Sequence, residues 1–201
     1  MFDLDEEIKK FRQYYQVRNS AEKDLDEAYK IAQKVAKHDA DHGNYLFGIC
    51  YEFGMGVEKD LDEALRYFSF LVGKNDSEEV IHRIGNIYAE KKEYEKTIEM
   101  YTISANLGYV LSMRCLANLY SDLSNEHKIT VDYEKASHYY KLAADKGDQL
   151  SAERYANMLV KGLGVPQNKD EALRYYGMAN TSESAQIKIE MLNHTGSENE
   201  L

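Results

Sequence analysis

Lys23-Asp24-Leu25-Asp26-Glu27-Ala28 recurs unchanged as Lys59-Asp60-Leu61-Asp62-Glu63-Ala64, at an offset of 36 residues. Recurrence of six consecutive residues at a fixed offset is the mark of a repeat architecture. Three such periods further on, Gly54-Met55-Gly56-Val57 returns as Gly162-Leu163-Gly164-Val165. Weaker copies fill the gap, so that the equivalent small anchor residues are Ala28, Ala64, Thr97, Ala136 and Ala172. The chain is therefore an array of units of about 36 residues.

Each unit divides into two helical patterns. The first carries a small residue followed three positions later by a large one, which places both on one face: Gly48 with Tyr51, Gly85 with Tyr88, Ala117 with Tyr120, Ala156 with Leu159. A small residue allows a paired helix to approach closely. The second pattern begins with a capping box, in which two side chains satisfy backbone N–H groups at the helix start: Asp24 with Glu27, Asp60 with Glu63, Asn168 with Glu171.

The periodicity predicts an all-α protein, with no competing strand pattern. The expected helices cover about 4–18, 24–37, 42–53, 60–73, 78–89, 92–107, 110–122, 132–146, 150–161, 168–180 and 184–193. The turn between the two helices of a unit is shortened after Tyr88 and lengthened between Ser121 and Val131. Length variation confined to a turn is how helical repeats tolerate change.

The pattern Gly48-x-x-Tyr51-x-x-Gly54-x-Gly56-Val57-x-x-Asp60-x-x-x-Ala64-x-x-Tyr67 resembles the Sel-one-like repeat, a relative of the tetratricopeptide repeat. The resemblance covers nearly the whole chain. Lys91 and Lys92 replace the Gly-x-Gly turn after Tyr88, and the longer turn replaces it after Tyr120. The resemblance implies a right-handed superhelical solenoid of antiparallel helix pairs that acts as a scaffold for protein or peptide binding.

We predict one solenoid over residues 1–193. It begins with a degenerate unit at 1–38, whose polar first helix caps one end. Pairs follow at 39–75, 76–109, 110–147 and 148–182, and a helix at 183–193 caps the other end. Residues 194–201 are expected to form a flexible tail.

Charge and composition exclude several classes of protein. The 201 residues include 25 Lys and Arg against 35 Asp and Glu, a net charge of -10 that argues against nucleic-acid binding and for neutral to basic partners. The acidic start lacks the features of a signal peptide, and no stretch has the roughly 20 apolar residues of a membrane helix. We therefore expect a cytoplasmic protein with no membrane association, in which Cys50 and Cys115 are reduced core thiols.

No cofactor, metal or catalytic site is predicted. Gly54-x-Gly56 and Gly162-x-Gly164 follow no strand, so turns explain them better than a phosphate cradle does. His38 and His42 are spaced to share a metal on one helix, but they fall at a junction between units and no third His or Cys is near in sequence. No Ser, Cys or Thr has the sequence context of a catalytic nucleophile.

A polar set follows the small positions: Gln13, Asn86, Asn118, Asn157 and Asn193, with Ile49 as the exception. Residues three or four earlier share their helical face. In the solenoids that this chain resembles, the first helix of each unit lines the concave surface. An Asn offers an acceptor and two donors, which match an extended peptide backbone. The candidate partner-binding residues are Tyr45, His82, Asn86, Arg114, Asn118, Glu153 and Asn157. Replacing Asn118 and Asn157 by Ala is expected to weaken partner capture and to leave thermal stability nearly unchanged. Alternatively, these Asn residues are simply tolerated at exposed helix positions.

Two classes of function remain open. The first is a non-catalytic adaptor or scaffold that binds a peptide or protein on its concave face, and the repeats favour it. The second is a regulatory or accessory part of an enzyme, or a hydrolase-like solenoid whose site is not evident in the sequence. A pocket with paired groups of shifted pKa would support the second class.

Overall fold

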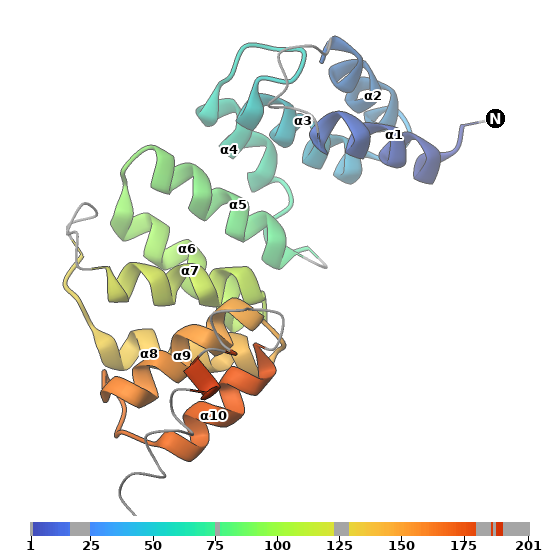
Figure 1. Cartoon of the computed structure of the whole chain (residues 1–201). Helices are drawn as coiled ribbons and strands as arrows, with labels where there is room; N and C mark the ends of the chain where they lie inside the picture. Colours follow the sequence, from blue (N-terminus) through green and yellow to red (C-terminus); the bar gives the residue numbers. More distant parts are fainter. Residues whose placement is uncertain are drawn as a thin grey trace, which may run out of the picture. The chain divides into compact units, whose positions relative to one another are not determined.

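A computed structural model describes residues 2–16, 25–74, 77–122, 129–179, 186 and 188–190. In these ranges the regular secondary structure is helical, as predicted, and Figure 1 shows the helices in chain order. They are α1 (Leu4–Gln16), α2 (Asp26–Ala36), α3 (Ala40–Phe53), α4 (Leu61–Ser69), α5 (Ser77–Glu90), α6 (Tyr94–Asn106), α7 (Val110–Ser121), α8 (Tyr133–Asp145), α9 (Gln149–Lys161) and α10 (Lys169–Met178).

The helices belong to two compact units. The first, Met1–Lys91, holds α1 to α5, and the second, Lys92–Leu201, holds α6 to α10. Within each unit every helix packs against the next one along the chain. The expected pair at 76–109 supplies α5 to the first unit and α6 to the second. The single continuous solenoid stays a prediction.

The small positions bring paired helices into contact, as expected. A Cβ atom added at Gly48 would lie 2.5 Å from Cε1 of Phe68, a ring that α4 contributes and that is fully buried. Beside this contact Tyr51 stacks on Tyr67, with ring centroids 5.6 Å apart. In the second unit, Tyr120 and Tyr139 occupy the same repeat positions and stack in the same way, with centroids 6.3 Å apart. Small and large residues thus set the distance between the two helices of a pair.

The helix starts confirm half of each testable capping box. The side chain of Asp60 accepts the N–H groups of Asp62 and Glu63, and that of Asn168 accepts the N–H of Glu171. Glu63 does not complete the box, because its carboxylate binds Arg66 at 2.6 Å. Asp24 lies outside the described residues.

The backbone N–H of each capping residue is satisfied from the preceding helix instead. Asp60 donates to the carbonyl oxygen of Tyr51 at 3.0 Å, and Asn168 donates to that of Leu159 at 3.1 Å. Asp132 makes the same bond to Tyr120 at 2.8 Å, although the connection before it is longer. The large positions therefore anchor the second helix through their carbonyl groups as well as through their side chains.

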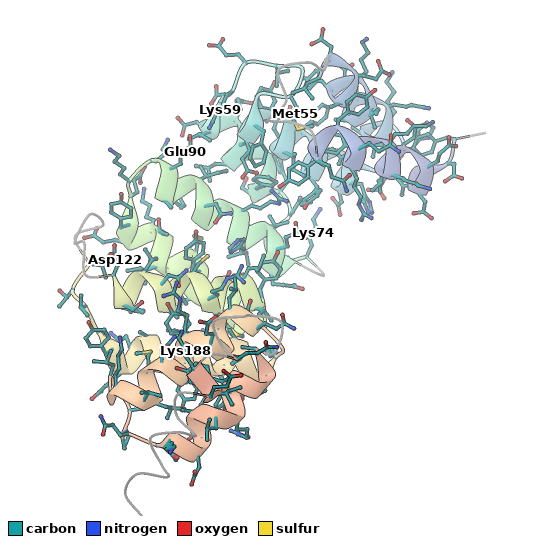
Figure 2. The ribbon with its side chains drawn as sticks, viewed as in Figure 1. Met55, Lys59, Lys74, Glu90, Asp122 and Lys188 are labelled. Carbon is teal, nitrogen blue, oxygen red and sulfur yellow. The ribbon has the colours of Figure 1, made fainter. Side chains whose placement is uncertain are left out.

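The Gly-x-Gly segments are turns, as predicted. Gly54 and Gly162 both have φ of 69° and end their helices in the left-handed conformation that glycine tolerates best. Met55, labelled in Figure 2, is fully buried between the two glycines of the first turn. Where no glycine is present, Lys92 adopts φ of 61°.

Two expectations need correction, one about the end of α4 and one about the polarity of α1. Helix α4 ends at Ser69 and not near 73, because the N–H of Leu71 turns back to the carbonyl of Phe68 and Gly73 has φ of 83°. Leu71 is still buried, which explains why its spacing resembled a helix continuation. Helix α1 is more than a polar cap, because Phe11 is buried.

The predicted closing helix is described only at Gln186 and at residues 188–190, which are helical. Ile189 packs against the buried cluster of α8, α9 and α10, and Lys188, labelled in Figure 2, pairs with Glu153 at 2.7 Å. Residues 191–201, which include Asn193 and the expected tail, lie outside the described residues. Among the described helices, none combines the length and apolar character that a membrane span requires.

Candidate functional site

All seven candidate residues lie on helices predicted as the first of a pair. In the first unit Tyr45 lies on α3, and His82 and Asn86 lie on α5. In the second unit Arg114 and Asn118 lie on α7, and Glu153 and Asn157 lie on α9.

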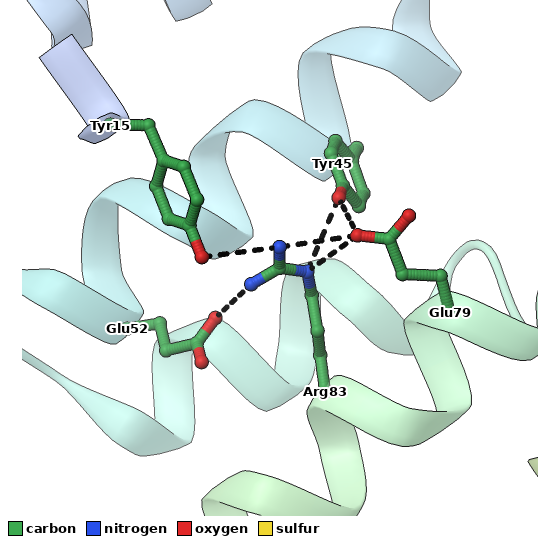
Figure 3. Close-up of polar contacts among 5 residues, drawn as sticks. All are labelled: Tyr15, Tyr45, Glu52, Glu79 and Arg83. Carbon is green, nitrogen blue, oxygen red and sulfur yellow. Dashed lines mark hydrogen bonds and ion pairs between the residues drawn. The ribbon is translucent and has the colours of Figure 1, made fainter. Parts of the chain in front are cut away.

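In the first unit, Tyr45 belongs to a polar cluster centred on Arg83 (Figure 3). The Arg83 side chain is only 12% exposed and pairs with Glu52 at 3.2 Å and with Glu79 at 3.2 Å. Its Nη2 also donates to the Tyr15 hydroxyl at 3.4 Å. The guanidinium carbon lies 5.4 Å and 5.5 Å from the ring centres of Tyr15 and Tyr45, which favours the cation.

The hydroxyl of Tyr45 is fully engaged in this cluster. It donates to Glu79 at 2.5 Å and accepts from Nε of Arg83 at 3.2 Å, and burial raises its pKa. The cluster ties α1, α3 and α5 together. Because two carboxylates already surround the guanidinium, its first role is structural.

The remaining candidates of the first unit offer little free surface. His82 is only 8% exposed, so its ring is poorly placed to select a partner's side chain. Asn86 is partly buried and already takes part in a polar contact.

In the second unit, the two Asn residues have an unexpected partner in their own repeat. The Tyr140 hydroxyl, from α8, donates to Oδ1 of Asn118 at 2.6 Å. The Tyr176 hydroxyl, from α10, donates to Oδ1 of Asn157 at 2.8 Å. Both tyrosine rings are buried, and burial raises the pKa of Tyr176 to about 12.

The first unit supplies an internal comparison for these pairs. At the equivalent repeat positions it has Ile49 in place of the Asn and Phe68 in place of the Tyr, and both are buried. Where the side chain offers no acceptor, the ring therefore carries no hydroxyl. Asn118 and Asn157 therefore take part in the packing of their own helix pairs, which the sequence did not indicate. Replacing either by Ala would leave a tyrosine hydroxyl without its acceptor, which has a cost in stability.

The donor side of each amide remains available. Neither Asn118 nor Asn157 gives its Nδ2 hydrogens to another residue in the part of the chain that the structure describes. Because the oxygen is held by a tyrosine, each amide has one fixed orientation with its N–H groups pointing elsewhere. The unused groups of these amides are mainly donors, because one lone pair of each oxygen is taken by a tyrosine hydroxyl.

The other two candidates of this unit are in ion pairs. Arg114 binds Asp148, which caps α9, at 2.6 Å, and Glu153 binds Lys188 at 2.7 Å. Both pairs link separate elements, so these residues already contribute to the structure.

Beside Asn118 the surface is hollowed. This α7–α9 hollow has a volume of about 300 Å³ and is lined by Asn118, Leu119, Ser121, Asp122, Tyr140 and Arg154. Asp122, at the end of α7, is labelled in Figure 2. Such a volume is at the lower end of the range of ligand sites, with room for a side chain of a partner.

Sequence reasoning missed Arg83 and Arg154, although a signal was present. Each arginine lies two residues before the small residue of its repeat, which is Gly85 for Arg83 and Ala156 for Arg154. In the other two repeats that keep a small residue, the equivalent residues are Leu46 and Cys115. A long cation recurring at a position otherwise occupied by buried or half-buried side chains is unusual, and it could have been noticed.

A larger hollow of about 560 Å³ lies beside the start of α8. It is lined by Tyr120, residues 129–135 and Gly164. Two of its three charged residues pair with each other, because Asp132 accepts the N–H of Lys135 at the helix start and also binds the Lys135 ammonium group at 3.1 Å. None of the seven candidates lines it.

The residues considered for metal binding and nucleophilic chemistry have structural roles. Asp39 caps α3, and the His42 N–H that it accepts lowers its pKa, while His42 Nδ1 lies 2.9 Å from the same carboxylate. No group of three potential metal ligands is found among the described residues. Burial raises the pKa of Cys50 to about 12 and also raises that of Cys115, which opposes thiolate formation.

Comparisons with known proteins agree with the repeat pattern. A family model described as the Sel1 repeat matches residues 42–70, 116–148 and 150–181. A sel1-like repeat-containing protein of Acanthamoeba polyphaga mimivirus is 28% identical over 141 residues, which are 70% of this chain and 25% of that protein. DAP3-binding cell death enhancer 1 of Rattus norvegicus is 25% identical over 176 residues, 84% of this chain and 34% of that protein. The chain thus spans about a quarter to a third of the length of these relatives.

Among solved structures, a protective antigen of uropathogenic Escherichia coli, described as displaying an SLR fold, has a TM-score of 0.72 with this chain. The two are 22% identical, and the match covers 96% of this chain and 42% of that one. This likeness shows the fold. The three matches to the family model and the repeated Gly, Tyr and Asp positions show that this is a Sel1-like repeat protein.

Proposed function

We propose that the chain is a non-catalytic adaptor that binds an extended peptide segment of a partner protein on its concave face. The binding surface is the face of α7 and α9 that carries Asn118 and Asn157. The observation that carries the proposal is that both amides are held by a buried tyrosine hydroxyl, at 2.6 and 2.8 Å, with their N–H donors unused by the described residues. Backbone carbonyl groups of an extended peptide supply the matching acceptors.

The family and one relative support this proposal. Sel1 repeats are commonly protein-interaction scaffolds, and the name of the rat relative describes a protein that binds DAP3. The raised pKa values of both cysteines favour binding over thiol catalysis.

The test is comparative capture with a variant that removes the donors and keeps the fold. Asn118→Ala with Tyr140→Phe, combined with Asn157→Ala with Tyr176→Phe, replaces both partners of each hydrogen bond by apolar groups, which is close to neutral for stability. The buried Ile49 and Phe68 show that the chain accepts an apolar pair at these positions. Tyr140→Phe with Tyr176→Phe serves as the matched control, because it retains both amides.

Affinity purification with quantitative mass spectrometry then compares the wild-type chain, the control and the fourfold variant. We expect partners captured by the wild type and the control to be lost from the fourfold variant while its melting temperature stays close to that of the control. Equal recovery of every partner by a folded fourfold variant would show that the amides do not form the binding surface.

A further inference from the structure

The α7–α9 hollow is lined by an arginine, Arg154, whose charge is not paired with any described residue. Arg154 is exposed on α9, and within the described residues it forms no ion pair. By contrast, two other charged residues of α7 and α9 are in ion pairs: Arg114 with Asp148 and Glu153 with Lys188. A guanidinium presents five N–H donors in a planar fork and cannot be deprotonated in a protein.

The same hollow holds the fixed amide of Asn118. Its oxygen accepts from the Tyr140 hydroxyl, which fixes the amide, and its two N–H donors are not used by the described residues. Ser121 Oγ donates to the backbone carbonyl oxygen of Asn118 at 3.2 Å and lies 3.2 Å from the Tyr140 hydroxyl, which further holds these groups in place. Arg154 and the amide nitrogen of Asn118 therefore offer a ligand donors.

Among the described residues, Asp122 is the one acidic residue that lines the hollow, and it has an interaction of its own. A ligand for this hollow must supply acceptors, and a negative charge is favoured by the unpaired guanidinium. A carboxylate meets both requirements because it accepts two hydrogen bonds in the geometry of the Arg fork.

We infer that the α7–α9 hollow binds the carboxylate of a single Asp or Glu side chain in the partner's extended segment. This inference rests on the proposed function. Arg154 pairs with the carboxylate, and Asn118 donates to the same group or to the adjacent backbone carbonyl. The net charge of -10 opposes a strongly acidic partner, so the acidic residue stands in an otherwise neutral or basic segment.

The test uses a phage library of short random peptides whose C-termini are fused to the coat protein, so that no free chain terminus is displayed. Peptides are selected on the full chain and then synthesised with acetylated and amidated ends. Fluorescence anisotropy measures binding of each selected peptide and of its Glu→Gln or Asp→Asn version. The proteins compared are the wild type, Arg154→Gln and a matched control, Arg174→Gln, which removes the same charge from another exposed arginine.

We expect selected peptides to share one acidic position. Its neutralisation should weaken binding to the wild type and to Arg174→Gln roughly tenfold. It should change binding to Arg154→Gln less than about twofold, because the hollow then lacks its cation.

The possible failures are distinct. If selected peptides bind and the fourfold Asn and Tyr variant loses them, but neutralising the acid has the same effect with and without Arg154, the carboxylate site is wrong and the peptide surface stands. If no peptide binds the folded chain, the proposed function fails and the carboxylate site fails with it.

Discussion

Gly48→Ala tests the contact that sets the spacing between α3 and α4. The added Cβ would lie 2.5 Å from Cε1, 2.7 Å from Cδ1 and 2.7 Å from Cζ of Phe68. Carbon atoms in contact are normally about 3.5 to 4.0 Å apart, so the ring would have to move by about 1 Å. Phe68 is fully buried and has no solvent to move into.

The size of the effect follows from two opposing terms. Overpacking of this kind costs about 1 to 3 kcal/mol, while replacing a helical glycine by alanine stabilises by about 1 kcal/mol. Gly177→Ala isolates the second term, because Gly177 lies in α10 with no atom within 4 Å of an added Cβ. We expect Gly177→Ala to stabilise the protein and Gly48→Ala to be less stable than that control by about 1 to 3 kcal/mol.

Urea unfolding followed by far-UV circular dichroism measures both variants. A third measurement places Gly48→Ala in a Phe68→Leu background, which removes Cε1 and Cζ of the ring. There the alanine should no longer be destabilising, so the two changes should be coupled. Equal stabilisation by Gly48→Ala and Gly177→Ala, or additive effects of Gly48→Ala and Phe68→Leu, would refute the proposed packing.

Three further predictions concern stability. Lys92→Gly should raise the free energy of unfolding by about 1 kcal/mol, because the exposed Lys92 has φ of 61°, which is unfavourable for a residue with a Cβ atom. Lys92→Ala should not stabilise the protein, and equal urea midpoints for the two variants would contradict this prediction. Ser151→Ala should stabilise the protein by about 1 kcal/mol, since the buried Ser151 hydroxyl has no hydrogen-bond partner among the described residues. Ser112→Ala should destabilise it by losing the 2.7 Å bond to Ser104, so calorimetry should give shifts of opposite sign. Lys34 and Lys10 lower the pKa of Glu7 below its usual 4.5, so the stability that these ion pairs contribute is present above that pH and is lost as pH falls through the lower pKa of the folded state. Glu7→Gln should therefore reduce the loss of unfolding free energy at acidic pH. An unchanged dependence of stability on acidic pH would count against the ion pairs.

The sequence by itself determined the helical repeat and most helix boundaries. Gly48, Gly54 and Asp60 could be interpreted from sequence because close packing, a left-handed helix end and an N-cap each require particular residue types at positions near one another in the chain. The same logic failed at residues 70 to 73, where a buried Leu71 continued the apolar spacing after the helix had ended.

Only the tertiary structure decided what the candidate site residues do. Asn118 and Asn157 were found from their repeat position, but their acceptors are taken by Tyr140 and Tyr176, which come from the next helix. Arg154 remains unpaired within the described residues, whereas Arg83 at the same repeat position is enclosed by Glu52 and Glu79. The physical reason is that helix period and caps depend on neighbouring residues, whereas hydrogen-bond partners depend on which side chains helix packing brings within about 3 Å. The sequence therefore indicated which face to examine, and the packing decided that this face presents donors.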